Sequence, residues 1–230
     1  QTDFQGKADA SSSDGQGGFI EVSGATLSYD SFLNQLKLGS GGHFLLDPTD
    51  ILIDSTLASS IEGMLDGGTD VSLTTSTGGA DVGDITVAAN IQVPTNNLGD
   101  TGTLSLTADR DIVVNGGVTV QNLQEDFTPG QTVFDFTAGR DIVLSGDLRH
   151  SGINAETGRG SILLSAGGDV NVNNVSVDAN GGSLNITANN LILDGLNSNL
   201  VAGFSGEDTA SINVAAASGV TFAGGLIQTF

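Results

Sequence analysis

The feature that most constrains the fold is a strand-like segment that returns along most of the chain. Residues 103–114, TLSLTADRDIVV, come back at 133–144 as VFDFTAGRDIVL. Weaker copies follow at a spacing of about 28 residues that varies from copy to copy. Such elastic repetition is typical of a solenoid, in which each turn adds a layer and loops of different length project outward. The positions that correspond are Thr74, Thr107, Thr137, Ser165, Thr187 and Ala215.

Apolar and polar residues alternate in each copy. Each copy has two apolar residues two positions apart, and the residue between them is polar except at Leu163. This period of two predicts a strand with one buried face. The inward positions are Val71, Leu104, Phe134, Ile162, Leu184 and Ile212, followed two residues later by Leu73, Leu106, Phe136, Leu164, Ile186 and Val214.

A second and a third strand complete each copy. Three short strands per turn predict an all-β, right-handed parallel β-helix of about nine turns, a rod of roughly 40–45 Å at ~4.8 Å per layer. The alternation also permits an antiparallel β-sandwich, but a sandwich has no reason to repeat Thr-Ala-x-Arg-Asp-Ile at a turn-like spacing. The second strand has the inward pairs Ile85/Val87, Ile112/Val114, Ile142/Leu144, Val170/Val172, Leu191/Leu193 and Val220/Phe222, and the third has Val118/Val120 and Val175/Val177.

The composition agrees with one elongated domain over residues 1–230. Gly supplies 34 residues and Pro 3, and helix-forming charged residues are scarce, as in a chain of short strands and tight turns. Two segments break the pattern. Apolar residues at Leu57, Ile61, Met64 and Leu65 predict a short amphipathic helical insertion over 55–68. The polar stretch 121–131 is predicted to be a protruding loop.

The charge excludes one class of partner. Six basic and 27 acidic residues give a net charge of −21, which repels phosphate backbones and excludes nucleic-acid binding. The chain has no Cys, so disulfides and thiolate metal sites are excluded as well. No apolar run approaches the ~18 residues that cross a bilayer, and the first residues lack a leader pattern. We therefore expect no membrane insertion and a chain that is either mature or excised from something longer.

Three segments carry a family resemblance: GGFIEVSG at 17–24, LLDPTDILID at 45–54 and IEGMLDGGTDVSLT at 61–74. They resemble the filamentous-haemagglutinin-like exoproteins of two-partner secretion. In that family such segments form a β-helical shaft after the amino-terminal secretion domain. The likeness is specific over 17–75, whereas the later repeats are generic to β-helical exoproteins. The chain departs from the full pattern, because its start does not match a secretion domain and it contains no Arg-Gly-Asp.

The resemblance implies a structural or adhesive shaft of a large secreted protein on the surface of a Gram-negative bacterium. Its role would be cell-surface adhesion or a biofilm or filament scaffold. The implied partners are an outer-membrane secretion pore, neighbouring β-helix turns of the same chain or of adjacent subunits, and a host-surface or matrix glycan or protein. The alternative is a β-helical polysaccharide-processing enzyme or glycan-binding module.

An enzyme of that kind needs carboxylates that converge, often beside a basic residue. The candidates are Asp109, Arg110 and Asp111, with Arg140 and Asp141 in the next copy. Residues that recur in successive turns favour a structural role, since an active site need occur only once. In that role each Asp caps its own turn and each Arg pairs with the Asp of the adjacent turn. We therefore predict no catalytic residues and no enzyme activity.

Metal and cofactor motifs are weak. A calcium solenoid needs tandem Gly-Gly-x-Gly-x-Asp repeats, and the nearest approaches, at 78–81 and 167–170, are isolated. His43 and His150 lie far apart in sequence with no second ligand at metal spacing, which favours structural or surface roles. No phosphate-binding glycine loop with its Lys is present. We expect no metal site and no cofactor.

The two ends suggest a place for the chain in a larger assembly. Residues 220–222 and 226–230 are strand-like and apolar, and no helix or charged segment follows to cover the last turn. A β-helix exposes unpaired backbone groups and an apolar cross-section at its ends, which natural solenoids close with a cap. We therefore expect residues 1–230 to be an internal segment of a longer exoprotein or filament.

Overall fold

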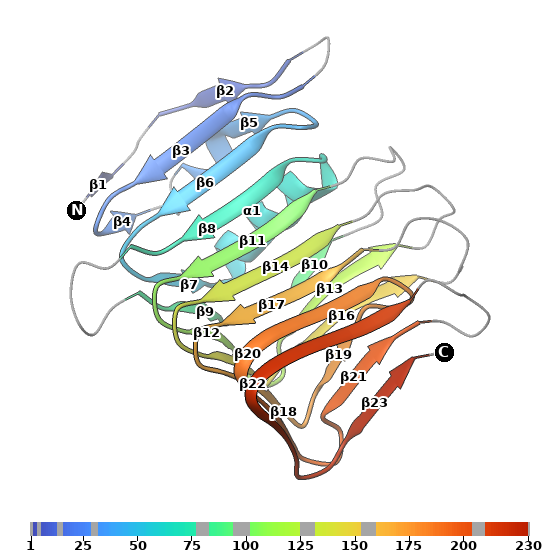
Figure 1. Cartoon of the computed structure of the whole chain (residues 1–230). Coiled ribbons are helices and arrows are strands. Elements are labelled where there is room, and N and C mark those ends of the chain that lie inside the picture. Colours follow the sequence, from blue (N-terminus) through green and yellow to red (C-terminus); the bar gives the residue numbers. More distant parts are fainter. Residues whose placement is uncertain are drawn as a thin grey trace.

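The backbone winds into a parallel β-helix (Figure 1). The computed structural model describes residues 2–3, 6–12, 16–28, 32–76, 83–93, 102–124, 132–152, 160–203 and 210–229. Within these residues every strand pair is parallel, and one α-helix interrupts the strands. The all-β solenoid with three strands per turn and one short inserted helix, predicted from the repeat, is confirmed.

The first face carries the longest strands. Eight of them stack in sequence order, and the last two bend through a corner to continue on the second face. They are β3 (Phe19–Ser23), β6 (His43–Asp47), β8 (Asp70–Thr74), β11 (Thr103–Ala108), β14 (Val133–Ala138), β17 (Ile162–Ala166) and the first parts of β20 (Ser183–Asp194) and β22 (Ser211–Phe222).

The second face is built from shorter strands and joins the first through β20, so the two faces form a single 13-stranded sheet. Its members before β20 are β7 (Ile51–Ile53), β9 (Ile85–Val87), β12 (Ile112–Val114), β15 (Ile142–Leu144) and β18 (Asp169–Asn173). The predicted second strand is therefore confirmed. At Leu191 and Leu193 the chain reaches this face without a separate turn, because β20 runs on through the corner.

The third face is a separate six-stranded sheet. Six strands give about six complete three-stranded turns rather than the nine expected, because the first turns are built differently. There the chain forms the two-stranded sheets β1 (Thr2–Asp3)/β4 (Leu27–Ser28) and β2 (Ala8–Ala10)/β5 (Leu36–Leu38), together with a 3-10 turn η1 (Leu33–Gln35). The six strands are β10 (Ile91–Val93), β13 (Thr119–Gln124), β16 (Asp147–Gly152), β19 (Ser176–Asp178), β21 (Asn199–Ala202) and β23 (Leu226–Thr229).

The expectation for residues 121–131 is partly wrong. Residues 121–124 belong to β13, which pairs over six residues with β16, and 125–131 lie outside the described residues. The third strand also begins later than predicted, since Val120 and Asn122 are the buried pair and Val118 precedes the strand. The strand could not be recognised from the sequence, because residues 121–124 are mostly polar and the inward position 122 is an asparagine.

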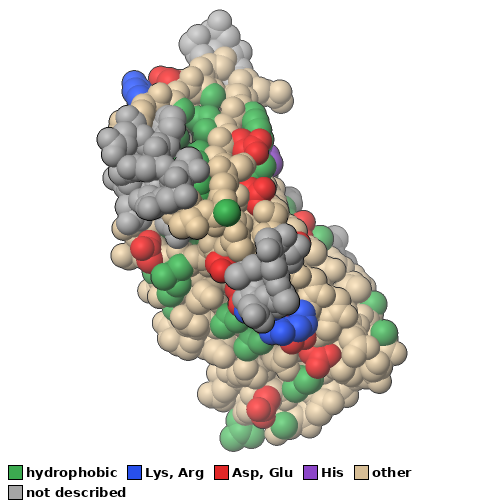
Figure 2. Space-filling model, turned by 90° about the vertical axis from the view of Figure 1, so that its left-hand side faces the viewer, with side chains coloured by type: hydrophobic (Ala, Val, Ile, Leu, Met, Phe, Trp, Pro, Cys, Tyr) green, Lys and Arg blue, Asp and Glu red, His purple; other side chains and the backbone are tan. Residues whose placement is uncertain are grey.

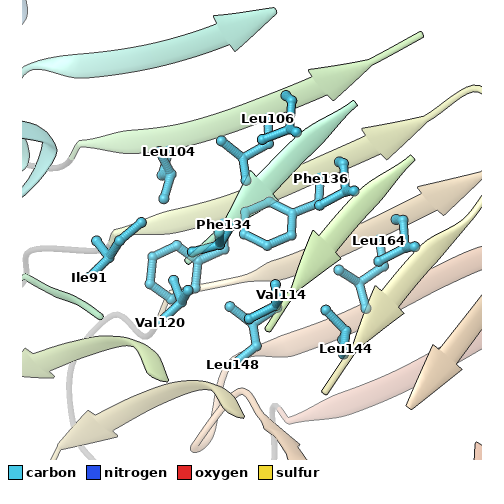
Figure 3. Packing of buried hydrophobic residues seen from close by; sticks show 14 of the residues in the cluster. Ile91, Leu104, Leu106, Val114, Val120, Phe134, Phe136, Leu144, Leu148 and Leu164 are labelled. Atoms are coloured by element: carbon cyan, nitrogen blue, oxygen red, sulfur yellow. The ribbon is translucent and has the colours of Figure 1, made fainter. Parts of the chain in front are cut away.

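The register of the first face matches the repeat. Thr107 pairs with Thr74 on one side and Thr137 on the other, and the column continues through Ser165, Thr187 and Ala215. Inward residues of the same type therefore stack on one another from turn to turn. Figure 3 shows the resulting core, in which Leu104, Leu106, Phe134, Phe136 and Leu164 of the first face meet residues of the other two faces.

The inserted helix α1 (Ser55–Asp66) confirms the prediction for 55–68. Its first turn is capped by Asp54, whose carboxylate accepts the backbone N–H groups of Thr56 and Leu57 at 2.9 and 3.0 Å. Leu57, Ala58, Ile61 and Leu65 are buried. The helix packs against β7, β8 and β10, so it stands on the third face where later turns place a strand.

The last layer differs from the others. In β22 the inward positions Val214, Val220 and Phe222 are 37%, 42% and 54% exposed, whereas their equivalents in preceding turns are buried. Ile227 of β23, which pairs with Leu200, is 40% exposed. Within the described residues no strand stacks below these two.

Candidate functional site

Two of the acidic residues singled out in the sequence, Asp111 and Asp141, belong to a column of carboxylates at the corner between the first and second faces. We call it the corner ladder. Its members are Asp50, Asp84, Asp111, Asp141 and Asp169, one from each of five successive turns. Each follows a first-face strand and lies where the chain changes direction, directly before a second-face strand or, for Asp169, at its first residue.

Each carboxylate of the corner ladder accepts the backbone N–H of the equivalent residue one turn further on. The distances from that nitrogen to Oδ1 are 3.0 Å at Asp50, 3.2 Å at Asp84, 3.1 Å at Asp111, 2.8 Å at Asp141 and 3.2 Å at Asp169. The last of these nitrogens belongs to Asn190, whose side-chain amide also donates to Asp169 at 2.7 Å. The ladder therefore joins turn to turn along the corner.

Two arginines reinforce the ladder with bidentate ion pairs. The Arg110 guanidinium donates through Nε to Asp84 Oδ1 at 2.6 Å and through a second nitrogen to Oδ2. Arg140 repeats this arrangement on Asp111, with Nε 2.8 Å from Oδ1. The hydrogen bond from Arg110 lowers the pKa of Asp84, and the same contact raises the pKa of the guanidinium. Both partners are held in their charged forms.

The geometry tests the structural role predicted for these residues. The expected pairing of each Arg with the Asp of the adjacent turn is confirmed. The expected capping of an aspartate's own turn is wrong for these residues, because the N–H that each accepts lies in the next turn. Asp109 stands apart, and its backbone N–H donates to Thr75.

In the Arg140–Asp111 ion pair, we expect the buried aspartate to contribute more to the free energy of unfolding than the exposed arginine. Asp111 is 9% exposed and holds both the Asp141 N–H and Arg140, whereas the Arg140 side chain is 57% exposed. Asp111→Ala should lower the free energy of unfolding by about 2 kcal/mol, and Arg140→Ala should lower it by clearly less. Urea denaturation measures both. Equal losses would show that the ion pair, and not the backbone contact, stabilises the corner.

The two histidines do not come together. His43 lies on the outer side of β6 with its ring centroid 5.5 Å from that of Phe19. His150 lies in the core, stacked on Phe134 with centroids 4.6 Å apart. Of the two calcium-like segments, 78–81 lies outside the described residues. In the second, 167–170, the Asp169 carboxylate accepts a hydrogen bond from the Asn190 side chain. In the described part of the chain, no three His, Cys, Asp or Glu side chains are grouped to hold a metal.

His150 is a buried residue that sequence reasoning did not place. It occupies the inward column of the third face between Asn122 and the core position filled by Ala179. Burial lowers the pKa of His150 to about 4, and the nearby backbone of Ser161 opposes this shift. Neither ring nitrogen has a hydrogen-bond partner among the described residues, because the Ser161 contact does not reach hydrogen-bond geometry. The only signal in the sequence is that His150 follows Leu148 by two residues, the spacing of inward side chains.

The outer side of the first face carries mostly uncharged side chains. Its threonine column, with Ser165 at one level, is partly or fully exposed. Neighbouring turns are linked by hydrogen bonds between side chains, Ser161 to Ser183 at 2.9 Å and Asn213 to Asn185 at 2.9 Å. Figure 2 shows one side of the molecule on which uncharged polar groups and backbone prevail and acidic side chains are scattered.

Comparison with known proteins does not extend this description. No family model, no curated protein and no solved structure matches the chain. Among the described residues, no helix is long and apolar enough to cross a membrane.

Proposed function

We propose that this chain is the shaft of a filamentous-haemagglutinin-like exoprotein, which serves adhesion or scaffolding at the surface of a Gram-negative bacterium. The corner ladder is the observation that carries the proposal. Its carboxylates bond from turn to turn over five turns, so they build length and stiffness. Catalysis by contrast requires a few groups that converge on a substrate.

The surface chemistry supports the same proposal. A net charge of −21 keeps an elongated all-β chain soluble, and the outer hydroxyl and amide columns offer repeated weak contacts to a glycan or a protein. Many weak contacts along a rod add up when both partners are repetitive. The family resemblance adds the expectation of export through an outer-membrane pore, to which a chain without Cys is suited.

Adhesion is the activity to test first. Beads coated with the folded chain should adhere to surfaces carrying matrix glycans or matrix proteins, and beads coated with the same chain after thermal unfolding should not. The same preparation should release no reducing ends from acidic polysaccharides. Absence of adhesion to every surface would contradict the adhesive role. Release of reducing ends that is lost in a folded Asp141→Ala variant would establish the enzyme alternative instead.

A further inference from the structure

Helix α1 interrupts the third face between two strands. Before it, β5 pairs with β2 in a two-stranded sheet, and after it, β10 begins the six-stranded sheet. Figure 1 shows α1 behind β8 and β11, at a level between β5 and β10. The helix therefore faces one strand edge on each side, and each edge presents backbone groups that need partners.

The helix satisfies only one of these edges. On the β10 side, the Glu62 carboxylate accepts the backbone N–H of Gln92 at 2.7 Å, and buried helix residues pack on the strand. On the β5 side the described residues place β2 along one edge of the strand and no strand along the other. A groove separates that second edge from the helix.

The groove has the size and lining of a binding site. Its volume is about 400 Å³, within the range of sites that hold small ligands and short peptide segments. Leu36, Leu38 and Met64 supply an apolar lining, and Ser60 adds a hydroxyl that already donates to the Thr56 carbonyl at 3.1 Å. Lys37 lies between the two leucines on β5 and is exposed. Gly63 contributes the wall on the helix side.

Gly63 is an unusual choice for the middle of a helix. Glycine is a poor helix former, and it is expected inside a helix where a side chain would collide with a neighbour. A Cβ at Gly63 would meet no atom within 4 Å. Packing in this structure therefore does not require the glycine, and its effect is to leave the groove open on the side that faces β5.

We propose that the groove between α1 and β5 binds an extended peptide from another polypeptide, which adds a strand to the open edge of β5. A strand edge offers alternating N–H and C=O groups, and an extended backbone is the ligand that satisfies them. Apolar side chains on one side of the added strand would contact Met64 and the leucines of the groove. This interaction is separate from the adhesive role of the outer face.

The charges near the groove define the other side of the bound strand. Lys37 is exposed and stands in register with Asp9 of β2, whose carboxylate is 3.9 Å from the Lys7 ammonium. Among the described residues of this patch, two lysines stand against one aspartate, so it is locally positive on a chain whose net charge is −21. An acidic side chain in the added strand would lie beside Lys37, so the partner segment alternates apolar and acidic residues.

The probe is a dye-labelled heptapeptide of alternating valine and aspartate, and its binding to the whole chain is followed by fluorescence anisotropy. Gly63→Phe fills the groove, so binding should fall at least tenfold. Gly63→Ala adds only a methyl group and improves the helix, so it is the matched control and should bind as the parent does. Circular dichroism confirms that both variants are folded.

Two further measurements identify the mode of binding. Lys37→Glu should weaken the valine–aspartate peptide at least fivefold and favour a valine–lysine peptide. A peptide N-methylated at alternate residues should not bind, and the bound parent peptide should slow hydrogen exchange within Leu36–Leu38. The proposal is wrong if the heptapeptide does not bind at millimolar concentration, or if Gly63→Phe leaves its binding unchanged. Equal binding of the N-methylated peptide would establish an apolar ligand site in place of strand addition.

Discussion

Leu106→Asn is expected to lower the free energy of unfolding by about 4 kcal/mol. Leu106 has no exposed surface and stacks in register between Leu73 and Phe136. Removing a buried leucine costs about 2–5 kcal/mol, and an amide without partners adds about 1–3 kcal/mol. For a chain of this size such a loss lowers the midpoint of thermal unfolding by roughly 10 °C.

Ser105→Asn is the matched control, because its side chain points outward from the same strand and is half-buried. Asparagine is preferred to aspartate there, since Asp135 is the cross-strand neighbour and a second carboxylate would add repulsion. The control should change the free energy of unfolding by less than about 0.5 kcal/mol. Thermal melts followed by circular dichroism make the comparison, and equal losses would contradict the register described for the first face.

The fold was predictable because the repeat and the alternation point to the same register. The anchor column from Thr74 to Ala215 is aligned in the structure as it is in the sequence. Equivalent residues of successive turns stack on one another, so a repeat in the sequence appears in the structure as a column of aligned residues. The third face was harder to predict, because β13 and β16 carry Asn122 and His150 at inward positions and lack a clear apolar alternation.

The candidate site was predictable in its residues and only partly in its bonds. Recurrence of Arg-Asp in two turns indicated pairing between turns, and Arg110 and Arg140 confirm it. The ladder extends further than that repeat, to Asp50 and Asp169, whose surrounding residues differ. What these carboxylates share is a place in the fold, at the start of a second-face strand, and that place is known only once strands are assigned.

The groove beside α1 illustrates a different limit of sequence reasoning. The helix itself follows from the spacing of its apolar residues and from its Asp54 cap. Its consequence for the third face does not, because the sequence does not say which strand edges the helix separates. Glu62 reaches β10, and Gly63, the next residue, leaves the side toward β5 open. The difference between a covered and an open edge thus depends on two adjacent positions.

Acidification below neutral pH is expected to destabilise the protein through His150. Its pKa is about 4 in the folded chain against the ordinary 6.5, so the folded state keeps the imidazole neutral while the unfolded state takes up a proton. Above pH 6.5 both states are neutral and the residue has no effect on the pH dependence. Between pH 6.5 and 4 stability falls by about 1.4 kcal/mol per pH unit, which amounts to about 3 kcal/mol in all.

His150→Leu isolates this contribution, because leucine is similar in size and does not titrate. Burial raises the pKa of Asp135 and Asp178, and these carboxyls act in the opposite sense, favouring the folded state as the pH falls. They are present in both proteins, so they cancel when the free energies of unfolding of parent and variant are compared at pH 7.5, 6.0 and 4.5. The difference between the two proteins should shift by about 2–3 kcal/mol in favour of His150→Leu across this range. A constant difference would mean that the imidazole is solvated or hydrogen-bonded in the folded protein, and the stacked, unbonded placement against Phe134 would then be wrong.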